Sequence, residues 1–101
     1  MTGPGLGLNE HELDSIRRVF VRRPEITGAI VFGSRAKGTA TSSSDVDLAI
    51  EGIDDPLEAE ALASELDELP LPYRFEVKGL STIQSQALRE HIQRVGVRIY
   101  G

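Results

Sequence analysis

The chain has 101 residues, 11 basic and 16 acidic, so its net charge is −5 and its pI is near 4.9. With 40% hydrophobic residues it can bury one core, and this length predicts one domain. The acidic balance argues against direct nucleic-acid binding, which needs many Lys and Arg contacts with phosphates. The absence of cysteine excludes disulfides and thiolate metal sites.

The N-terminal segment is rich in glycine. Residues 1–8 contain three Gly and one Pro, and we expect them to form a flexible tail ahead of a single domain at residues 9–101. This segment has neither the basic flank nor the apolar core of a signal peptide, and no later apolar run reaches the length of a membrane span. We therefore expect a cytoplasmic protein without a membrane partner.

A helix is predicted from Asn9 to Pro24. Asn9 can cap its start together with Glu12 three positions later, and Pro24 ends the pattern. The apolar residues between them recur at helical spacing: Leu13, Ile16, Val19 and Phe20.

Two strand patterns follow. Residues 26–32 are β-branched or apolar throughout, which is typical of a strand covered on both faces, and the run ends at Gly33 and Ser34. Residues 45–50 alternate with period two. This places Asp45 and Asp47 on one face, opposite the inward-facing Val46, Leu48 and Ile50.

The second half of the chain predicts two more helices and a third strand. Asp55 and Pro56 start a helix, residues 73–78 alternate as a strand, and a last helix begins between Ser81 and Ser85 and ends at Gly96, before a short segment at 97–100. The apolar stripe expected on the first of these helices is Leu57, Ala61, Leu62, Leu66 and Leu69. Together the elements predict an α/β domain in which helices pack on a small mixed sheet.

The acids on the strands predict a metal site. Carboxylates at i and i+2 of one strand, Asp45 and Asp47, share a face, and Glu76 presents a third acid from another strand. Carboxylate oxygens are ligands of Mg²⁺, and two such ions about 3.5 to 4 Å apart stabilise the attacking and leaving oxygens of phosphoryl or nucleotidyl transfer. We therefore take Asp45, Asp47 and Glu76 as metal ligands and catalytic residues.

The Gly33–Ser34 turn predicts a phosphate site. Gly33 allows the backbone to approach a phosphate closely, and Ser34 adds a hydroxyl and an amide. Arg35 and Lys37 are placed to neutralise phosphate charge, although both are also compatible with plain solvated charges. We take these four residues as the nucleotide-binding set.

These residues together resemble a known superfamily. Gly33-Ser34 followed by Asp45-x-Asp47 and a later acid is similar to the signature of the DNA polymerase β-like nucleotidyltransferases. The run Gly33 to Gly38, the serines before Asp45 and the ending His91 to Tyr100 resemble the minimal nucleotidyltransferase (MNT) antitoxins. The resemblance covers residues 26–100.

The resemblance implies a polymerase β-like palm and an ATP-dependent enzyme with two Mg²⁺ ions. It further implies a protein adenylyltransferase that transfers AMP to a tyrosine of a HEPN-domain ribonuclease toxin and so acts as a type VII-like antitoxin. By the same resemblance, Gly33 and Ser34 match the phosphate-binding turn, Asp45 and Asp47 match the metal-binding acids, and Glu76 takes the third position, where the small members usually carry Asp.

Alternatives remain open at this point. Glu76 lies between Arg74 and Lys78 and is also compatible with a surface ion pair, while a lone helical His such as His91 is more typical of a surface or packing position. An antitoxin that binds and covers its toxin without catalysis is the second hypothesis. Adenylylation of a small molecule is weaker, because it usually needs an added helical domain.

Overall fold

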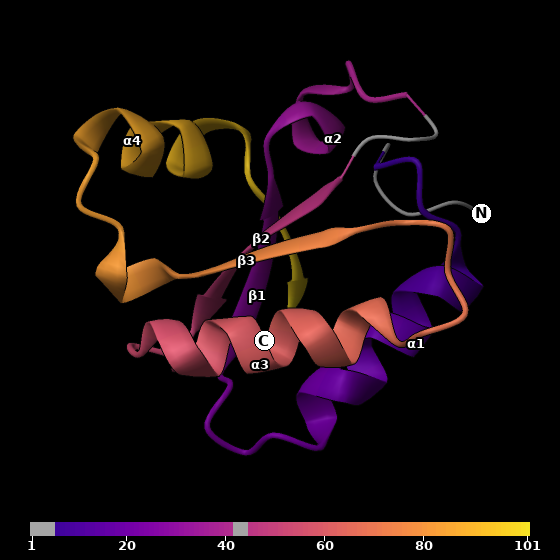
Figure 1. Ribbon diagram of the computed structural model, residues 1–101. Coiled ribbons are helices and arrows are strands. Elements are labelled where there is room, and N and C mark those ends of the chain that lie inside the picture. Colours follow the sequence, from indigo (N-terminus) through magenta and orange to yellow (C-terminus); the bar gives the residue numbers. More distant parts are fainter. Residues whose placement is uncertain (1–5, 42–44) are drawn as a thin grey trace.

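The computed structural model describes residues 6–41 and 45–101 and folds them into a four-stranded sheet with helices on both faces (Figure 1). This confirms the α/β class with a small mixed sheet. In chain order the elements are α1 (Glu10–Val21), β1 (Gly28–Phe32), α2 (Ser34–Lys37), β2 (Val46–Glu51), α3 (Pro56–Asp67), β3 (Phe75–Gly79), the 3₁₀ turn η1 (Leu80–Thr82), α4 (Gln86–Val95) and β4 (Val97–Tyr100).

The sheet has the strand order β3-β2-β1-β4. β1 lies antiparallel to both β2 and β4, whereas β2 and β3 run parallel and are joined by a crossover through α3. In this register Phe32 of β1 pairs with Asp47 of β2, and Asp47 pairs with Glu76 of β3. One row across three strands therefore holds two of the predicted acids.

The period of two along β2 separates two hydrophobic clusters. Val46, Leu48 and Ile50 are fully buried in the cluster that contains the apolar residues of α1 and α3. On the opposite face Ala49 packs in a smaller cluster with Phe32 and with Ile92 of α4. Asp47 shares this second face, so it lies on the side that α4 covers only in part.

The first helix starts as predicted. The Asn9 side chain accepts a hydrogen bond from the Glu12 amide at 2.8 Å, and Glu12 Oε1 accepts one from the Asn9 amide at 3.0 Å. The predicted cap of α3 is also present, because Asp55 accepts from the Leu57 amide at 2.9 Å.

The predicted apolar stripe of α3 is wrong at two positions. Leu57 is 72% exposed and Ala61 is exposed, whereas Ala59, Leu62 and Leu66 are buried. At about 100° per residue, Leu57 and Ala61 lie on the opposite side of the helix from these three. The small Ala59 lets the helix turn this face toward the sheet.

The predicted flexible tail is wrong at its end. Leu6 and Leu8 are 1% and 0% exposed and belong to the main core. Burying two leucines stabilises the segment by enough to offset the entropy of ordering it. The rest of the predicted tail, residues 1–5, lies outside the described residues, as do the serines at 42–44 that precede Asp45.

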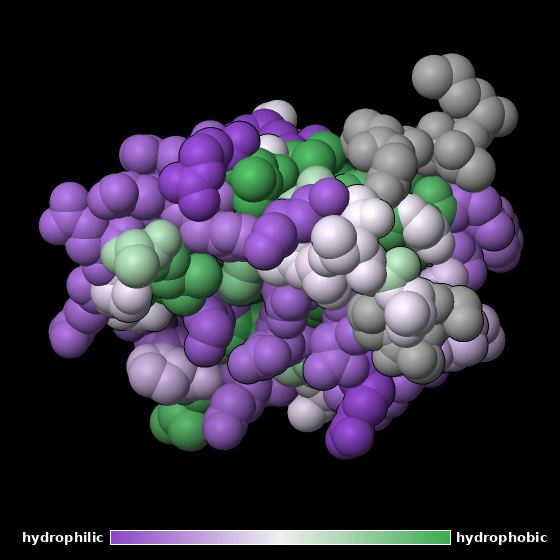
Figure 2. Space-filling view, turned by 90° about the horizontal axis from the view of Figure 1, so that it is seen from above, coloured by the Kyte–Doolittle hydropathy of each residue, from purple (hydrophilic) through white to green (hydrophobic). Residues whose placement is uncertain are grey.

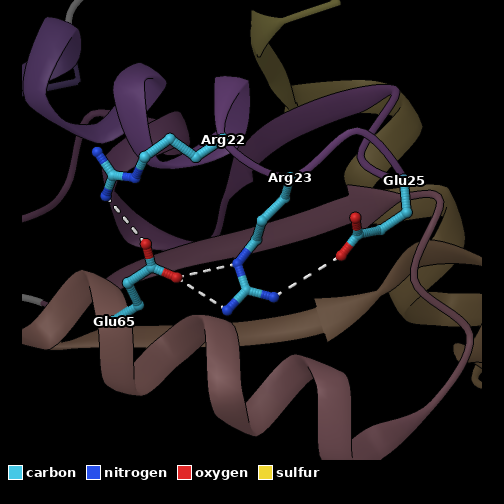
Figure 3. Close-up of polar contacts among 4 residues, drawn as sticks. All are labelled: Arg22, Arg23, Glu25 and Glu65. Carbon is cyan, nitrogen blue, oxygen red and sulfur yellow. Dashed lines mark hydrogen bonds and ion pairs between the residues drawn. The ribbon is translucent and has the colours of Figure 1, made fainter.

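An ion-pair network joins the end of α1 to α3 (Figure 3). Glu65 accepts from Arg22 at 2.9 Å and from Arg23 at 2.8 and 3.0 Å, and Arg23 also lies 3.7 Å from Glu25. The two guanidinium groups lower the pKa of Glu65 below its ordinary value. The network ties together the two helices that cover one face of the sheet.

The surface opposite α1 and α3 is mainly polar. In the view of Figure 2, hydrophobic residues form separate small areas between hydrophilic ones over the coloured part of this face. Within residues 6–41 and 45–101, every helix is too short or too polar to cross a bilayer.

Candidate active site

Three acids meet where β2 and β3 begin. Asp45 directly precedes β2, Asp47 is its second residue, and Glu76 is the residue of β3 paired with Asp47. Because side chains alternate along a strand, Asp45 and Asp47 leave the same face of the sheet. The predicted juxtaposition of the three carboxylates is present, while their catalytic role remains a prediction.

The electrostatics of Asp47 show how close these acids are. Partial burial, the negative charges of Glu76 and Asp45 and a hydrogen bond with Glu76 raise the pKa of Asp47 from 3.8 to about 6. The nearby Lys78 partly opposes this increase in the pKa. The cluster therefore carries more negative charge than its surroundings compensate, which is the condition that favours binding of a cation.

The Gly33–Ser34 turn lies directly against these acids. Gly33 has φ 76° and ψ −151°, a backbone conformation that residues with a Cβ rarely adopt. A Cβ at Gly33 would collide with the Asp47 carboxylate, so the glycine also provides the space that this carboxylate occupies. After the turn, α2 begins with a hydrogen bond from the Lys37 amide to the Gly33 carbonyl at 3.1 Å.

Arg35 is a buried residue of α2. Its side chain is 2% exposed, its Nη1 donates to the Leu6 carbonyl at 3.0 Å, and its guanidinium stacks 4.5 Å from the centre of the Tyr73 ring. These contacts account for the burial of Arg35, and its contact with a nucleotide phosphate stays a prediction. A stacked, buried guanidinium joins α2 to the N-terminal segment and to Tyr73, two residues before β3.

The other members of the predicted nucleotide-binding set differ in exposure. Ser34 is half-buried at the first position of α2, and Lys37 is exposed at the end of that helix. Gly33 lies against the Asp47 carboxylate, and Ser34 follows it directly in the chain. The contacts of Ser34 and Lys37 with a phosphate stay predictions.

The structure adds two residues to the site, Lys78 and His91, which the sequence analysis did not include in it. Lys78 Nζ lies 3.9 Å from Glu76 Oε1, so the predicted surface ion pair exists beside the coupling of Glu76 to Asp47. His91 Nε2 accepts a hydrogen bond from the Gly33 amide at 3.1 Å. No local pattern indicates this contact, because 58 residues separate its partners.

The donor set fits a hard divalent cation that is shared with a substrate. Among the residues that the structure describes, no three His, Cys, Asp or Glu side chains form a group able to hold a metal by themselves. Magnesium in nucleotide enzymes is usually held by one or two carboxylates plus the phosphates of the substrate. Asp45 and Asp47 can supply these carboxylates, and a bound cation would offset the mutual repulsion that raises the pKa of Asp47.

A separate cavity of about 420 Å³ lies at the far end of β3. Its lining comes from the start of α3, the end of β3, η1 and the start of α4, and includes Pro56, Ala59, Val77 and Leu88. None of the three clustered acids contributes to it. The cluster of acids therefore lies outside this cavity.

Comparison with known proteins identifies related folds. Residues 14–101 match the family model described as polymerase beta, nucleotidyltransferase. The chain is 25% identical, with a TM-score of 0.72, to a chain in the crystal structure of a toxin–antitoxin with AMP-PNP, covering 93% of this chain and 74% of that one. No curated protein matches the sequence significantly.

Two further structures share the fold at lower identity. One is a mutant of the toxin–antitoxin MntA–HpeT, with 21% identity, a TM-score of 0.74, and coverage of 88% of this chain and 73% of that one. The other is the tri-AMPylated HEPN toxin of Shewanella oneidensis in complex with an MNT antitoxin, with 19% identity, a TM-score of 0.70, and coverage of 91% and 71%.

Proposed function

Because the chain belongs to the polymerase beta nucleotidyltransferase family, we propose that it is a magnesium-dependent adenylyltransferase that modifies a tyrosine of a HEPN-type toxin and so acts as its antitoxin in the cytoplasm. The observation that carries the proposal is the position of the Gly33–Ser34 turn against Asp47, which pairs with Glu76 in one row of the sheet.

Each side chain then has a distinct task. The turn at Gly33 and Ser34 holds the triphosphate, since the missing Cβ lets the backbone approach closely. Asp45 and Asp47 would hold Mg²⁺, which when bound would supply positive charge that stabilises the transfer of a nucleotidyl group. Glu76 accepts the proton of the attacking hydroxyl, whose oxygen bonds to the α-phosphorus as the bond to pyrophosphate breaks.

The open position of the acids supports a protein as acceptor. Asp45 and Glu76 are exposed, and the cavity at the far end of β3 is separate from them. A small acceptor would need an enclosing pocket to be selected and oriented. A docked protein supplies its own orientation, which agrees with the toxin–antitoxin assemblies that share this fold.

Non-catalytic occlusion of the toxin is the second candidate. One observation favours it: the third acid is Glu76, whose side chain is one methylene longer than that of Asp. Octahedral Mg²⁺ tolerates displaced ligands poorly, so a longer acid would slow or abolish AMP transfer. The chain would then neutralise the toxin by binding alone.

One experiment separates the two. The purified chain is incubated with ATP labelled on the α-phosphate, Mg²⁺ and a HEPN toxin, and label on the toxin is measured together with toxin ribonuclease activity. Catalysis predicts label that disappears with Asp45→Asn and with Asp47→Asn but persists with Asp54→Asn, an exposed control. Neutralisation that survives the first two substitutions without label would establish occlusion instead.

A further inference from the structure

The backbone of the Gly33 turn is held by a side chain from a distant helix. The Gly33 amide donates to Nε2 of His91 at 3.1 Å, and the contact is partly buried. It reaches the one residue of the turn with a positive φ. Such a conformation persists only where surrounding contacts hold it.

The position of His91 follows from the packing of α4. Ile92, the next residue, is buried in the cluster with Phe32 and Ala49, and Leu88 packs against the same cluster. The imidazole meets the Phe32 ring edge to face, with ring centres 6.3 Å apart and an interplanar angle of 81°. Apolar contacts therefore set the direction from which Nε2 approaches the Gly33 amide.

The turn is consequently held from two sides. The Asp47 carboxylate occupies the space beside the Gly33 Cα, while His91 holds the amide. Asp47 has other partners in its acid cluster, and in the proposed function it binds metal. His91 holds the turn without taking part in that cluster.

We propose that His91 is a positioning residue that fixes the conformation of the Gly33–Ser34 turn and thereby prepares it to receive the nucleotide triphosphate. The second part rests on the proposed function, and the first does not. His91 must accept through an unprotonated Nε2, so the neutral ring carries its proton on Nδ1. A packing role would need only the shape of the ring, whereas the positioning role needs the acceptor atom.

Two substitutions separate shape from acceptor. His91→Phe keeps a ring against Phe32 but removes the acceptor, and His91→Gln removes the ring but keeps an amide oxygen able to accept. Gln93→Ala, on an exposed position of the same helix, is the matched control. The readouts are hydrogen exchange of the Gly33 amide by NMR, the MgATP dissociation constant by calorimetry, and KM and kcat for AMP transfer.

We expect His91→Phe to speed exchange of the Gly33 amide and to raise both the MgATP dissociation constant and KM by about 3- to 10-fold, the size of one lost hydrogen bond, with kcat within about twofold. His91→Gln and Gln93→Ala should stay near the native values. Equal behaviour of His91→Phe and His91→Gln would overturn the inference, as would faster exchange without any loss of MgATP affinity.

The outcome also distinguishes this inference from the proposed function. A native chain that binds no MgATP would refute the proposed function. Slow exchange of the Gly33 amide in that same chain, lost in His91→Phe and kept in His91→Gln, would still support the contact as the device that fixes the turn.

Discussion

Replacing Asp47 by Asn should stabilise the metal-free protein. The pKa of this carboxyl is raised from 3.8 to about 6, first by burial and then by the charges of Glu76 and Asp45. At 1.36 kcal/mol per pH unit, a shift of this size amounts to about 3 kcal/mol of destabilisation by the ionised form. Because Asp47 is only half-buried, solvent screening reduces this, and we expect a gain of about 1 to 2 kcal/mol at pH 7.5.

The same shift predicts a pH dependence. The folded-state pKa lies above the unfolded value, so the folded protein retains the proton of Asp47 between about pH 4 and pH 6. The contribution of Asp47 to the free energy of unfolding therefore falls as the pH rises through this window and stays low above it. Asp47→Asn should lose this part of the pH dependence.

Thermal unfolding at pH 4.5, 6.0 and 7.5 tests both statements. For a domain of this size the gain corresponds to a Tm increase of about 5 to 10 °C at pH 7.5, and a much smaller one at pH 4.5. Asp54→Asn, the same chemical change on an exposed loop, is the control. An Asp47→Asn protein with the native Tm and the native pH slope would refute the electrostatic argument, as would a destabilised one.

Three further substitutions test other parts of the site. Gly33→Ala forces a Cβ against the Asp47 carboxylate and should lower the free energy of unfolding by about 1 to 3 kcal/mol in denaturant titrations; native stability would contradict it. Arg35→Met removes the buried guanidinium from the Leu6 carbonyl and should cost about 1.5 to 3 kcal/mol, while leaving catalytic groups in place; unchanged stability with lost MgATP binding would show a nucleotide contact instead. Glu76→Asp should raise kcat for AMP transfer, and an equal or lower kcat would contradict the expectation that Asp serves better at this position.

The spacing of acids along the chain was informative because a strand has a strict local geometry. Asp45 and Asp47 share a face in any strand, so their convergence was predictable from the sequence, as were the caps at Asn9 and Asp55. The prediction that Glu76 lies near these two acids is also correct, because β2 and β3 run parallel in a register that pairs Glu76 with Asp47.

Contacts between distant segments followed no such local rule. The orientation of α3 about its axis, which exposes Leu57 and buries Ala59, depends on how the helix packs against the sheet and not on which residues are apolar. The glycine-rich composition of the N-terminal segment likewise led us to expect a flexible tail, although Leu8 is buried in the main core.

The sequence by itself determined three of the four strands, the caps at Asn9 and Asp55 and the pair of acids, because each depends on neighbours only a few residues apart. Only the tertiary structure decided that Arg35 is buried against Tyr73 and that His91 meets Gly33. These contacts join positions 38 and 58 residues apart, and they form only when hydrophobic burial brings separate elements together.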